Sequence, residues 1–216
     1  MQEIRTPGLQ QVVLSEKSLA DYAPVVGDEV IAELERLARP LQGARVLHIN
    51  ATAYGGGVAE ILHTLVPLMR SVGLDAEWRI ISGNDEFFNV TKSMHNALQG
   101  MDLDLTPAAQ AAYLHANVDN AVYFQDTFDY VIVHDPQPAA LRVLRPADPG
   151  HWIWRCHIDL TAANPKYWNF LRPYVQEYDA AIFTMPAYVK KDLKIGKVAI
   201  VPPAIDPLSP KNAPMN

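Results

Sequence analysis

Two clusters of polar residues directly follow short apolar runs, and their types suit the binding of a polar ligand. His134 and Asp135 follow one such run, and His157 and Asp159 follow the next. We expect both runs to be buried parallel strands, whose carboxyl ends bind ligands in open α/β sheets. Asp135 would accept hydrogen bonds from sugar hydroxyls, while His157 would hydrogen-bond a sugar or stabilise developing charge, with Asp159 fixing its orientation.

The same residues also allow purely structural roles, and these stay open at this point. Asp135 can cap a helix that begins at Pro136, and His157 can be a histidine whose hydrogen bonds serve only the fold. Cys156 precedes His157, but neighbours in a strand point to opposite faces, so a buried, inert cysteine is favoured over a thiol nucleophile. The sequence has neither a CxxC pair nor two ligands spaced along one helix, so we expect no metal site.

Three consecutive glycines, Gly55, Gly56 and Gly57, lie between a predicted strand at 45–50 and a predicted helix that begins near Val58. Glycines let a backbone approach a ligand closely, and a helix start presents unpaired N–H groups, so a phosphate or a sugar hydroxyl suits this loop. A tight turn without a ligand is the alternative. The loop lacks the third glycine of a dinucleotide fingerprint and the Lys-Ser/Thr of a P-loop, so a dehydrogenase or an NTPase is disfavoured and no cofactor is expected.

The segment 86–92 mixes polar and aromatic residues in a way that a plain surface helix would not need. We interpret it as part of a cleft that includes Asn89 and Lys92. Paired aromatic residues elsewhere can stack on sugar rings, although most of them are expected to pack in the core. These pairs are Trp152/Trp154, Tyr167/Trp168 and Phe87/Phe88.

Short apolar runs alternate with amphipathic stretches, which predicts a Rossmann-like α/β fold with a parallel sheet and helices on both faces. The runs that we interpret as strands are 45–50, 76–81, 130–134, 152–156, 180–183 and 198–201. The helical stretches are 28–39, 58–72, 85–99, 107–120, 136–144, 164–177 and 186–193. Thr106 is expected to cap the stretch at 107–120.

We divide the chain into three parts. Residues 1–43 form an N-terminal extension with one helix, residues 44–203 form the Rossmann-like domain, and residues 204–216 are a proline-rich interdomain linker or tail. Prolines cluster around this last boundary and stiffen the chain there.

Composition limits the classes of partner. The net charge of −6 at pH 7 argues against binding to nucleic acid or to an anionic membrane surface, because an acidic surface repels polyanions. The single cysteine is consistent with a reducing compartment, and neither a signal peptide nor a long apolar run is found, so a cytoplasmic location is expected.

Five segments, taken in order, resemble the N-terminal domain of the trehalose glycosyltransferring synthases, which are retaining enzymes of glycosyltransferase family four. Each segment is a weak signal alone, but the ordered set is specific, and the resemblance runs from about residue 20 to the end. The segments are 48–52, 55–62, 86–92, 133–140 and 154–159.

The resemblance implies a two-domain (GT-B) enzyme without a metal, in which the N-terminal domain binds the acceptor and the C-terminal domain binds the nucleotide sugar. The implied reaction joins nucleotide-glucose and glucose into trehalose, reversibly and with retention. By resemblance the glycine loop lies against the donor phosphate and sugar, Asp135 binds the acceptor, and His157 lies near the donor sugar. The further candidates for acceptor binding are Asn89, Lys92, Gln137 and Arg155.

The donor-binding domain of that family has no counterpart in these 216 residues, so we expect negligible transferase activity from the chain alone. The missing domain, in cis or in trans, is then the main partner, and the small-molecule partners are glucose, trehalose and nucleotide-glucose. Self-association into a homodimer stays open, since an exposed interdomain face would leave an apolar patch. Half of a trehalose phosphorylase and a non-catalytic sugar-binding module are the alternatives, and the preferred nucleotide base is undetermined.

Overall fold

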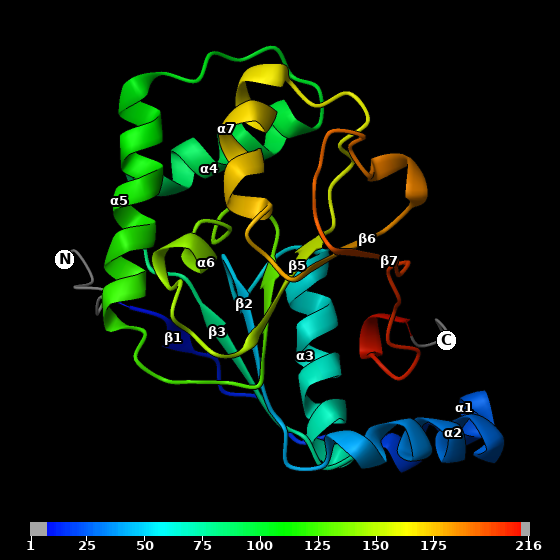
Figure 1. Cartoon of the computed structure of the whole chain (residues 1–216). Coiled ribbons are helices and arrows are strands. Elements are labelled where there is room, and N and C mark those ends of the chain that lie inside the picture. Colours follow the sequence, from blue (N-terminus) through cyan, green and yellow to red (C-terminus); the bar gives the residue numbers. More distant parts are fainter. Residues whose placement is uncertain (1–7, 213–216) are drawn as a thin grey trace.

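The computed structural model describes residues 8–212, and within them seven strands form one sheet in the order β1-β3-β2-β4-β5-β6-β7 (Figure 1). Residues 1–7, which include most of the N-terminal segment screened for a signal peptide, and residues 213–216 lie outside this part. The strands are β1 (Gln10–Gln11), β2 (Arg45–Asn50), β3 (Asp75–Ile80), β4 (Tyr130–His134), β5 (His151–Cys156), β6 (Ala180–Phe183) and β7 (Lys197–Ile200).

All neighbouring strands from β3 across to β7 are parallel, which confirms the Rossmann-like α/β fold. The expectation of a wholly parallel sheet is wrong at one edge, because β1 pairs antiparallel with β3, with Gln10 opposite Ile80. A two-residue strand is too short to show a periodic pattern, so its place depends on the exposed edge that β3 offers.

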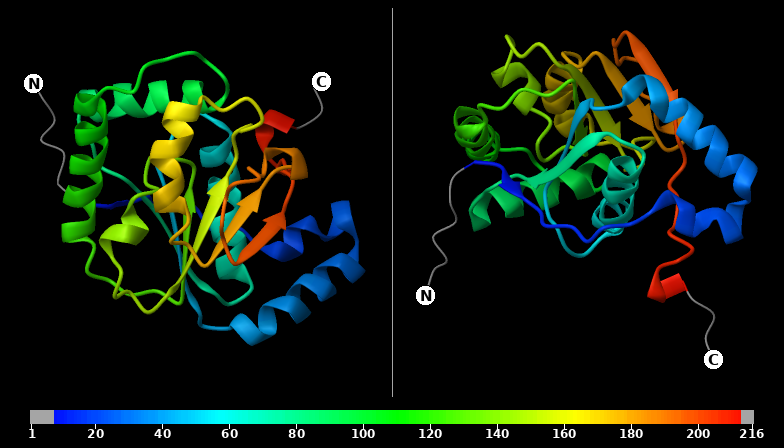
Figure 2. Two further views of the ribbon diagram at one scale, coloured as in Figure 1. Left: turned by 45° about the horizontal axis from the view of Figure 1, so that its top comes forward. Right: turned by 90° about the horizontal axis from the view of Figure 1, so that it is seen from below.

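Helices cover both faces of the sheet (Figure 2). Side chains alternate along a strand, so on β2 Val46 packs beneath α3, while Leu47 and Ile49 pack on the opposite face against α4, α5 and α7. The α-helices are α1 (Ala23–Val26), α2 (Asp28–Ala38), α3 (Gly57–Ser71), α4 (Asp85–Leu98), α5 (Pro107–Tyr123), α6 (Leu141–Leu144) and α7 (Pro165–Val175).

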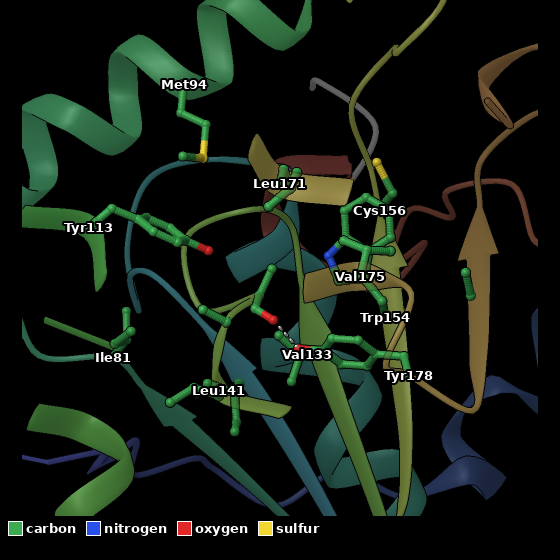
Figure 3. Packing of buried hydrophobic residues seen from close by; sticks show 14 of the residues in the cluster. Ile81, Met94, Tyr113, Val133, Leu141, Trp154, Cys156, Leu171, Val175 and Tyr178 are labelled. Atoms are coloured by element: carbon green, nitrogen blue, oxygen red, sulfur yellow. Dashed lines mark hydrogen bonds between the residues drawn. The ribbon is translucent and has the colours of Figure 1, made fainter. Parts of the chain in front are cut away.

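The larger core lies on the α4–α5–α7 side and is closely filled (Figure 3). Trp154 and Cys156 of β5 point into it and are fully buried, as is Tyr113 of α5. Trp152 and Trp168 are also buried. These aromatic residues are therefore core residues, as expected for most of the pairs, and the buried thiol of Cys156 has a raised pKa, as expected for an inert cysteine.

Two predicted helices differ from the structure. The stretch 136–144 is mostly turns, and only Leu141–Leu144 forms the short α6, because Pro138 disfavours the helical conformation at Gln137. Within 186–193 only Pro186–Tyr188 forms a turn of 3-10 helix. The apolar side chains of this stretch, including Leu193, pack on the core from an irregular loop, so tertiary contacts and not helical periodicity set its backbone.

The start of α5 follows the prediction closely. The Thr106 hydroxyl accepts a hydrogen bond from the backbone N–H of Ala109, at 3.2 Å, and Pro107 occupies the first turn. In α4 the Asn84 side chain caps the backbone N–H of Phe87 in the same way, at 2.9 Å. These caps fix the residues at which α4 and α5 begin.

The N-terminal extension and the C-terminal segment contact each other. Besides α1 and α2, the extension contains two turns of 3-10 helix, Leu19–Tyr22 and Arg39–Leu41, and a further such turn, Pro210–Asn212, ends the described chain. The Asp206 carboxylate accepts hydrogen bonds from Lys17, Tyr22 and Thr64, at 2.8–2.9 Å. The residues expected to form a linker or tail are thus tied to both the extension and α3. In residues 8–212 we find no helix with the length and apolarity needed to span a lipid bilayer.

Candidate functional site

The strand order reverses between β2 and β4. The chain passes from β2 to β3 on one side of it and then returns to β4 on its other side. Ligands of open α/β sheets bind outside the carboxyl ends of the strands at such a switch point. The glycine loop follows β2, His134 ends β4 and Asp135 comes directly after it, so two of the predicted clusters follow the carboxyl ends of these neighbouring strands.

The glycine loop has the backbone freedom that the sequence suggested. Gly55 and Gly56 have φ of 69° and 111°, a region that side chains with a Cβ rarely adopt, whereas Gly57 does not. A Cβ added at any of the three would have open space around it within 4 Å. Packing within the protein therefore does not by itself require glycine at these three positions. The last of them, Gly57, is the first residue of α3.

Asp135 has an unusual backbone and a buried carboxylate. Its φ is 61°, a left-handed value that Asp tolerates better than most residues. The Oδ1 atom accepts a hydrogen bond from the backbone N–H of His157 at 2.8 Å, and the Trp154 indole donates to the Asp135 carbonyl at 2.9 Å. Burial raises the pKa of the carboxyl to about 7, although the His157 N–H and the charge of Arg155 favour the ionised form.

The expectation that Asp135 caps a helix at Pro136 is wrong. The helix α6 begins only at Leu141, and its N-cap residue is Ala140, which makes no side-chain cap. Asp135 instead joins the ends of β4 and β5 through His157, which leaves a ligand-binding role as the remaining expectation.

His157 lies half-buried beside Asp135, directly after β5. Its Nε2 atom is hydrogen-bonded to Nδ1 of His134 at 2.9 Å. Burial, together with the nearby charge of Arg155, lowers the pKa of His157 to about 4, so the ring is neutral at pH 7. Asp159 does not orient the ring, contrary to expectation, because its Oδ1 accepts hydrogen bonds from the backbone and hydroxyl of Thr161.

The other predicted site residues are more dispersed. Asn89 and Lys92 are exposed on α4, and Gln137 is half-buried in the turn after Asp135. Arg155 is buried, and its guanidinium donates to the carbonyl oxygens of Phe183 and Val201, at the ends of β6 and β7. A role for these four residues in acceptor binding stays a prediction.

The sequence reasoning did not assign a role to His48, which is buried in β2 with its Nδ1 atom 3.0 Å from Nε2 of His134. The available signal was weak, since it consisted of a second histidine facing the α3 side of a neighbouring strand. In the described residues no group of three or more His, Cys, Asp or Glu side chains is arranged to hold a metal ion.

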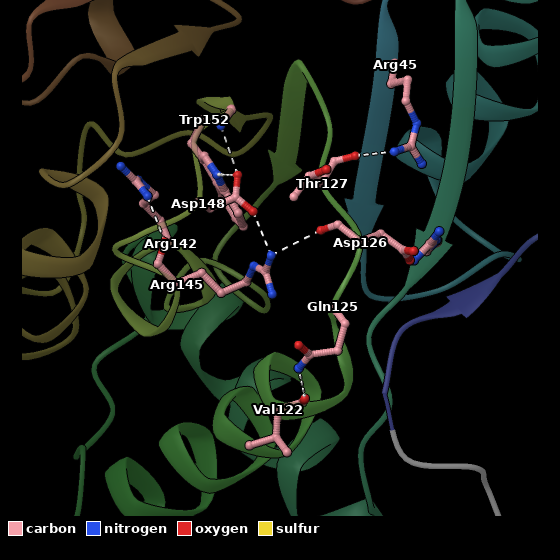
Figure 4. Close-up of polar contacts among 11 residues, drawn as sticks. Arg45, Val122, Gln125, Asp126, Thr127, Arg142, Arg145, Asp148 and Trp152 are labelled. Carbon is pink, nitrogen blue, oxygen red and sulfur yellow. Dashed lines mark hydrogen bonds and ion pairs between the residues drawn. The ribbon is translucent and has the colours of Figure 1, made fainter.

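At the amino ends of the strands, the polar residues make structural contacts. There Asp148 accepts hydrogen bonds from Arg145 at 2.7 Å and from the Trp152 indole at 3.2 Å (Figure 4). A pocket of about 580 Å³ opens at the amino ends of the strands, and it is lined by residues 40–45, 127–130 and 149–151. None of the predicted site residues lines it, so we do not identify it with the candidate site.

Comparison with known proteins agrees with the resemblance. A family model described as "Trehalose synthase, N-terminal domain" matches residues 48–190, which include the glycine loop, Asp135 and His157. The chain belongs to this trehalose synthase family. The α/β fold described above is consistent with the N-terminal half of a GT-B glycosyltransferase.

Relatives that carry the family's name are similar along most of the chain. The trehalose synthase of Pyrococcus horikoshii is 49% identical over 199 residues, which are 91% of this chain and 48% of that protein. The trehalose synthase of Rubrobacter xylanophilus is 49% identical over 209 residues, which are 94% of this chain and 50% of that protein. The chain therefore spans about half the length of these relatives.

A more distant similarity extends to another group of enzymes. The trehalose phosphorylase of Pleurotus pulmonarius is 27% identical over 214 residues, which are 87% of this chain and 29% of that protein. The trehalose synthase family and these phosphorylases thus share the part of the chain that contains the candidate site.

Proposed function

We propose that this chain is the acceptor-binding half of a retaining glycosyltransferase that makes trehalose from nucleotide-glucose and glucose in a reversible reaction. The observation that carries the proposal is the hydrogen bond between Asp135 and His157 at the carboxyl ends of β4 and β5, next to β2, whose carboxyl end leads into the open glycine loop. It is supported by the identity of about one half to relatives named trehalose synthase.

Each part of the candidate site has a role in this proposal. The Asp135 carboxyl group accepts hydrogen bonds from acceptor hydroxyls, and the neutral His157 hydrogen-bonds a sugar close to the donor. The backbone N–H groups of the glycine loop and the positive end of α3 stabilise the diphosphate as it leaves. Asn89, Lys92, Gln137 and Arg155 are further candidates for contact with the acceptor.

The proposed chemistry requires no nucleophile from the protein. The acceptor hydroxyl oxygen forms the new bond at the anomeric carbon on the face from which the phosphate leaves, and the hydroxyl proton passes to a phosphate oxygen. Configuration is thereby retained, and neither a cofactor nor a metal is invoked. In this proposal a second domain holds most of the nucleotide sugar, so the chain alone is inactive. The proposed location is the cytoplasm.

Two other functions remain as alternatives. Half of a trehalose phosphorylase is favoured by the similarity to the enzyme of Pleurotus pulmonarius, and it would depend on phosphate in place of a nucleotide sugar. A non-catalytic sugar-binding module would bind glucose or trehalose without turnover, even when a donor domain is supplied.

The test is trehalose formation from nucleotide-glucose and glucose by the chain alone and with the C-terminal half of the Pyrococcus horikoshii relative added. Trehalose formed only upon this addition is the expected result. Cleavage of trehalose that depends on inorganic phosphate would favour the phosphorylase, and sugar binding without turnover would favour the binding module.

The variant Gly57→Ala probes the glycine loop. Gly57 has no positive φ and a Cβ there meets no protein atom, so we expect the free energy of unfolding to stay within about 1 kcal/mol of wild type. A methyl group would hold the donor away from the loop, so turnover of the assembled enzyme should fall by about tenfold or more. Gly196→Ala, at an exposed glycine with ordinary φ, is the matched control and should change neither quantity. Wild-type turnover in Gly57→Ala would remove the loop from the proposed site.

A further inference from the structure

Three histidine rings from separate parts of the chain form one hydrogen-bonded row on the α3 side of the sheet. Nδ1 of His48 lies 3.0 Å from Nε2 of His134, and Nδ1 of His134 lies 2.9 Å from Nε2 of His157. The successive rings have centroids 5.3 Å and 5.2 Å apart, with interplanar angles of 29° and 15°. His48 and His134 are buried, and the half-buried His157 ends the row directly after β5.

All three rings are neutral at pH 7. Burial lowers the pKa of His48 to about 4 and the pKa of His134 well below its usual value, and the pKa of His157 is lowered to about 4. A neutral imidazole has one N–H donor and one bare acceptor nitrogen. Each N···N bond needs one of each, so the three rings must all share one tautomer, either Nε2–H or Nδ1–H.

The inner end of the row distinguishes these two arrangements. The Sδ atom of Met69, on α3, lies 3.4 Å from Nε2 of His48. A thioether sulfur accepts hydrogen bonds and cannot donate one. The Nε2–H tautomer of His48 therefore donates to Met69, whereas the Nδ1–H tautomer would place a bare nitrogen against the sulfur lone pairs.

The tautomer at the inner end determines the state of the outer ring. With Nε2–H on His48, Nδ1 of His48 accepts from His134, and Nδ1 of His134 accepts from His157. The Nδ1 atom of His157 is then bare. Within residues 8–212 no protein group bonds to this nitrogen, and the hydrogen bond from the His157 backbone to Asp135 holds the residue in place.

We propose that Met69 and His48, acting through His134, are positioning residues that hold His157 as its Nε2–H tautomer, so that Nδ1 accepts a hydrogen bond from a ligand hydroxyl. The ligand part rests on the function proposed above, for which the hydroxyl belongs to a sugar. A group that can only accept, such as a fully ionised phosphate oxygen, does not match this nitrogen. The row thus makes the site selective for a hydroxyl at this position.

The tautomers can be measured directly by long-range proton–nitrogen NMR of the histidine rings in the wild-type chain at pH 7. We expect a proton on Nε2 and a bare Nδ1 in His48, His134 and His157. A wild-type His157 with its proton on Nδ1 would overturn the proposal without any variant being made.

The variant Met69→Leu removes the acceptor at a similar side-chain volume. Loss of one weak hydrogen bond should shift the tautomer ratio of His157 about fivefold toward Nδ1–H. Met94→Leu is the matched control, because Met94 is fully buried in the core on the opposite face of the sheet, and the histidine signals should not change. An unchanged tautomer ratio in a folded Met69→Leu chain would contradict the role of Met69.

Titration of the same NMR samples with glucose and with trehalose separates the two levels of the proposal. A shift of the His157 Nδ1 signal with either sugar, and none with inorganic sulfate, which is fully ionised at pH 7 and can only accept hydrogen bonds, is the expected result. Tautomers as proposed without any shift would leave the positioning row intact and overturn the sugar hydroxyl as its ligand.

Discussion

Asp135 combines a strained backbone, a buried carboxyl and a place at the end of β4. Burial of this group in its charged form destabilises the fold. The carboxylate loses hydration that one backbone N–H and a nearby guanidinium replace only in part. The raised pKa of about 7 is the result. Perturbed groups of this kind cluster at functional sites, which agrees with the proposed role in acceptor binding.

The variant Asp135→Asn should change how stability depends on pH. Because the folded pKa of Asp135 is raised, its contribution to the free energy of unfolding is fully present below the unfolded pKa of about 4 and is lost as pH rises through about 7. The asparagine amide does not titrate, and asparagine tolerates the same backbone conformation. The stability of the variant relative to wild type should therefore rise with pH over this window, by roughly 4 kcal/mol at most.

Denaturant unfolding at a series of pH values measures this difference. The buried histidines have lowered pKa values and act in the opposite direction, because their contribution is lost as pH falls below the unfolded pKa of about 6.5. Comparing the two proteins at each pH cancels that common term. A difference that stays constant across the window would show that the carboxyl is not perturbed.

The helix α5 supports the turn that contains the site residues. The Tyr113 hydroxyl donates to the carbonyl of Pro136 at 2.8 Å, and the Asn117 amide donates to the carbonyl of Gln137 at 3.1 Å. These bonds replace the helical hydrogen bonds that the sequence led us to expect at 136–144. The turn is therefore held by side chains of another element, which explains why local periodicity misjudged it.

We expect Tyr113→Phe to loosen this turn. The loss of one buried hydrogen bond should lower the free energy of unfolding by about 1 kcal/mol and weaken sugar binding. Tyr167→Phe is the matched control, since the Tyr167 hydroxyl donates to the Asp104 carbonyl at 3.1 Å outside the site. It should lower stability by a similar amount and leave the affinity for glucose or trehalose unchanged, as measured by calorimetric titration. If Tyr113→Phe and Tyr167→Phe bound these sugars with the same affinity, the contact between α5 and the turn would not contribute to sugar binding.

Asp206 joins three distant parts of the molecule. Its carboxylate binds Lys17 and Tyr22 of the N-terminal extension and Thr64 of α3. Although burial opposes ionisation, the hydrogen bonds from Lys17 and Thr64 lower the pKa to about 2. A lowered carboxyl pKa stabilises the fold above the unfolded pKa of about 4, and this contribution is lost as pH falls toward about 2.

The variant Asp206→Ala should release two segments together. Hydrogen exchange at pH 7 is expected to increase in both 17–22 and 202–208, because one carboxylate holds both. Asp192→Ala removes an exposed carboxylate that binds Trp168 and Arg172, and it should affect only its own surroundings. Faster exchange in 202–208 alone would mean that the extension is anchored by its apolar contacts instead.

Local patterns were sufficient for much of the sheet and for parts of the site. The strands at 45–50, 130–134 and 180–183 were predicted with their observed bounds, because each is a buried apolar run next to turn-forming residues. The glycine loop, the Thr106 cap and the position of Asp135 at a strand end could be predicted for the same reason. Each of these features depends on neighbours within a few residues.

The remaining features join residues that are far apart in the chain. The row from Met69 through His48 and His134 to His157, the contacts of Asp206 and the antiparallel β1 all depend on contacts between separate elements. The raised pKa of Asp135 likewise results from burial between β4 and β5. Hydrogen bonds and desolvation act over a few ångströms in space regardless of separation along the chain, so packing of the elements was needed to reveal which polar groups meet and which lose their water.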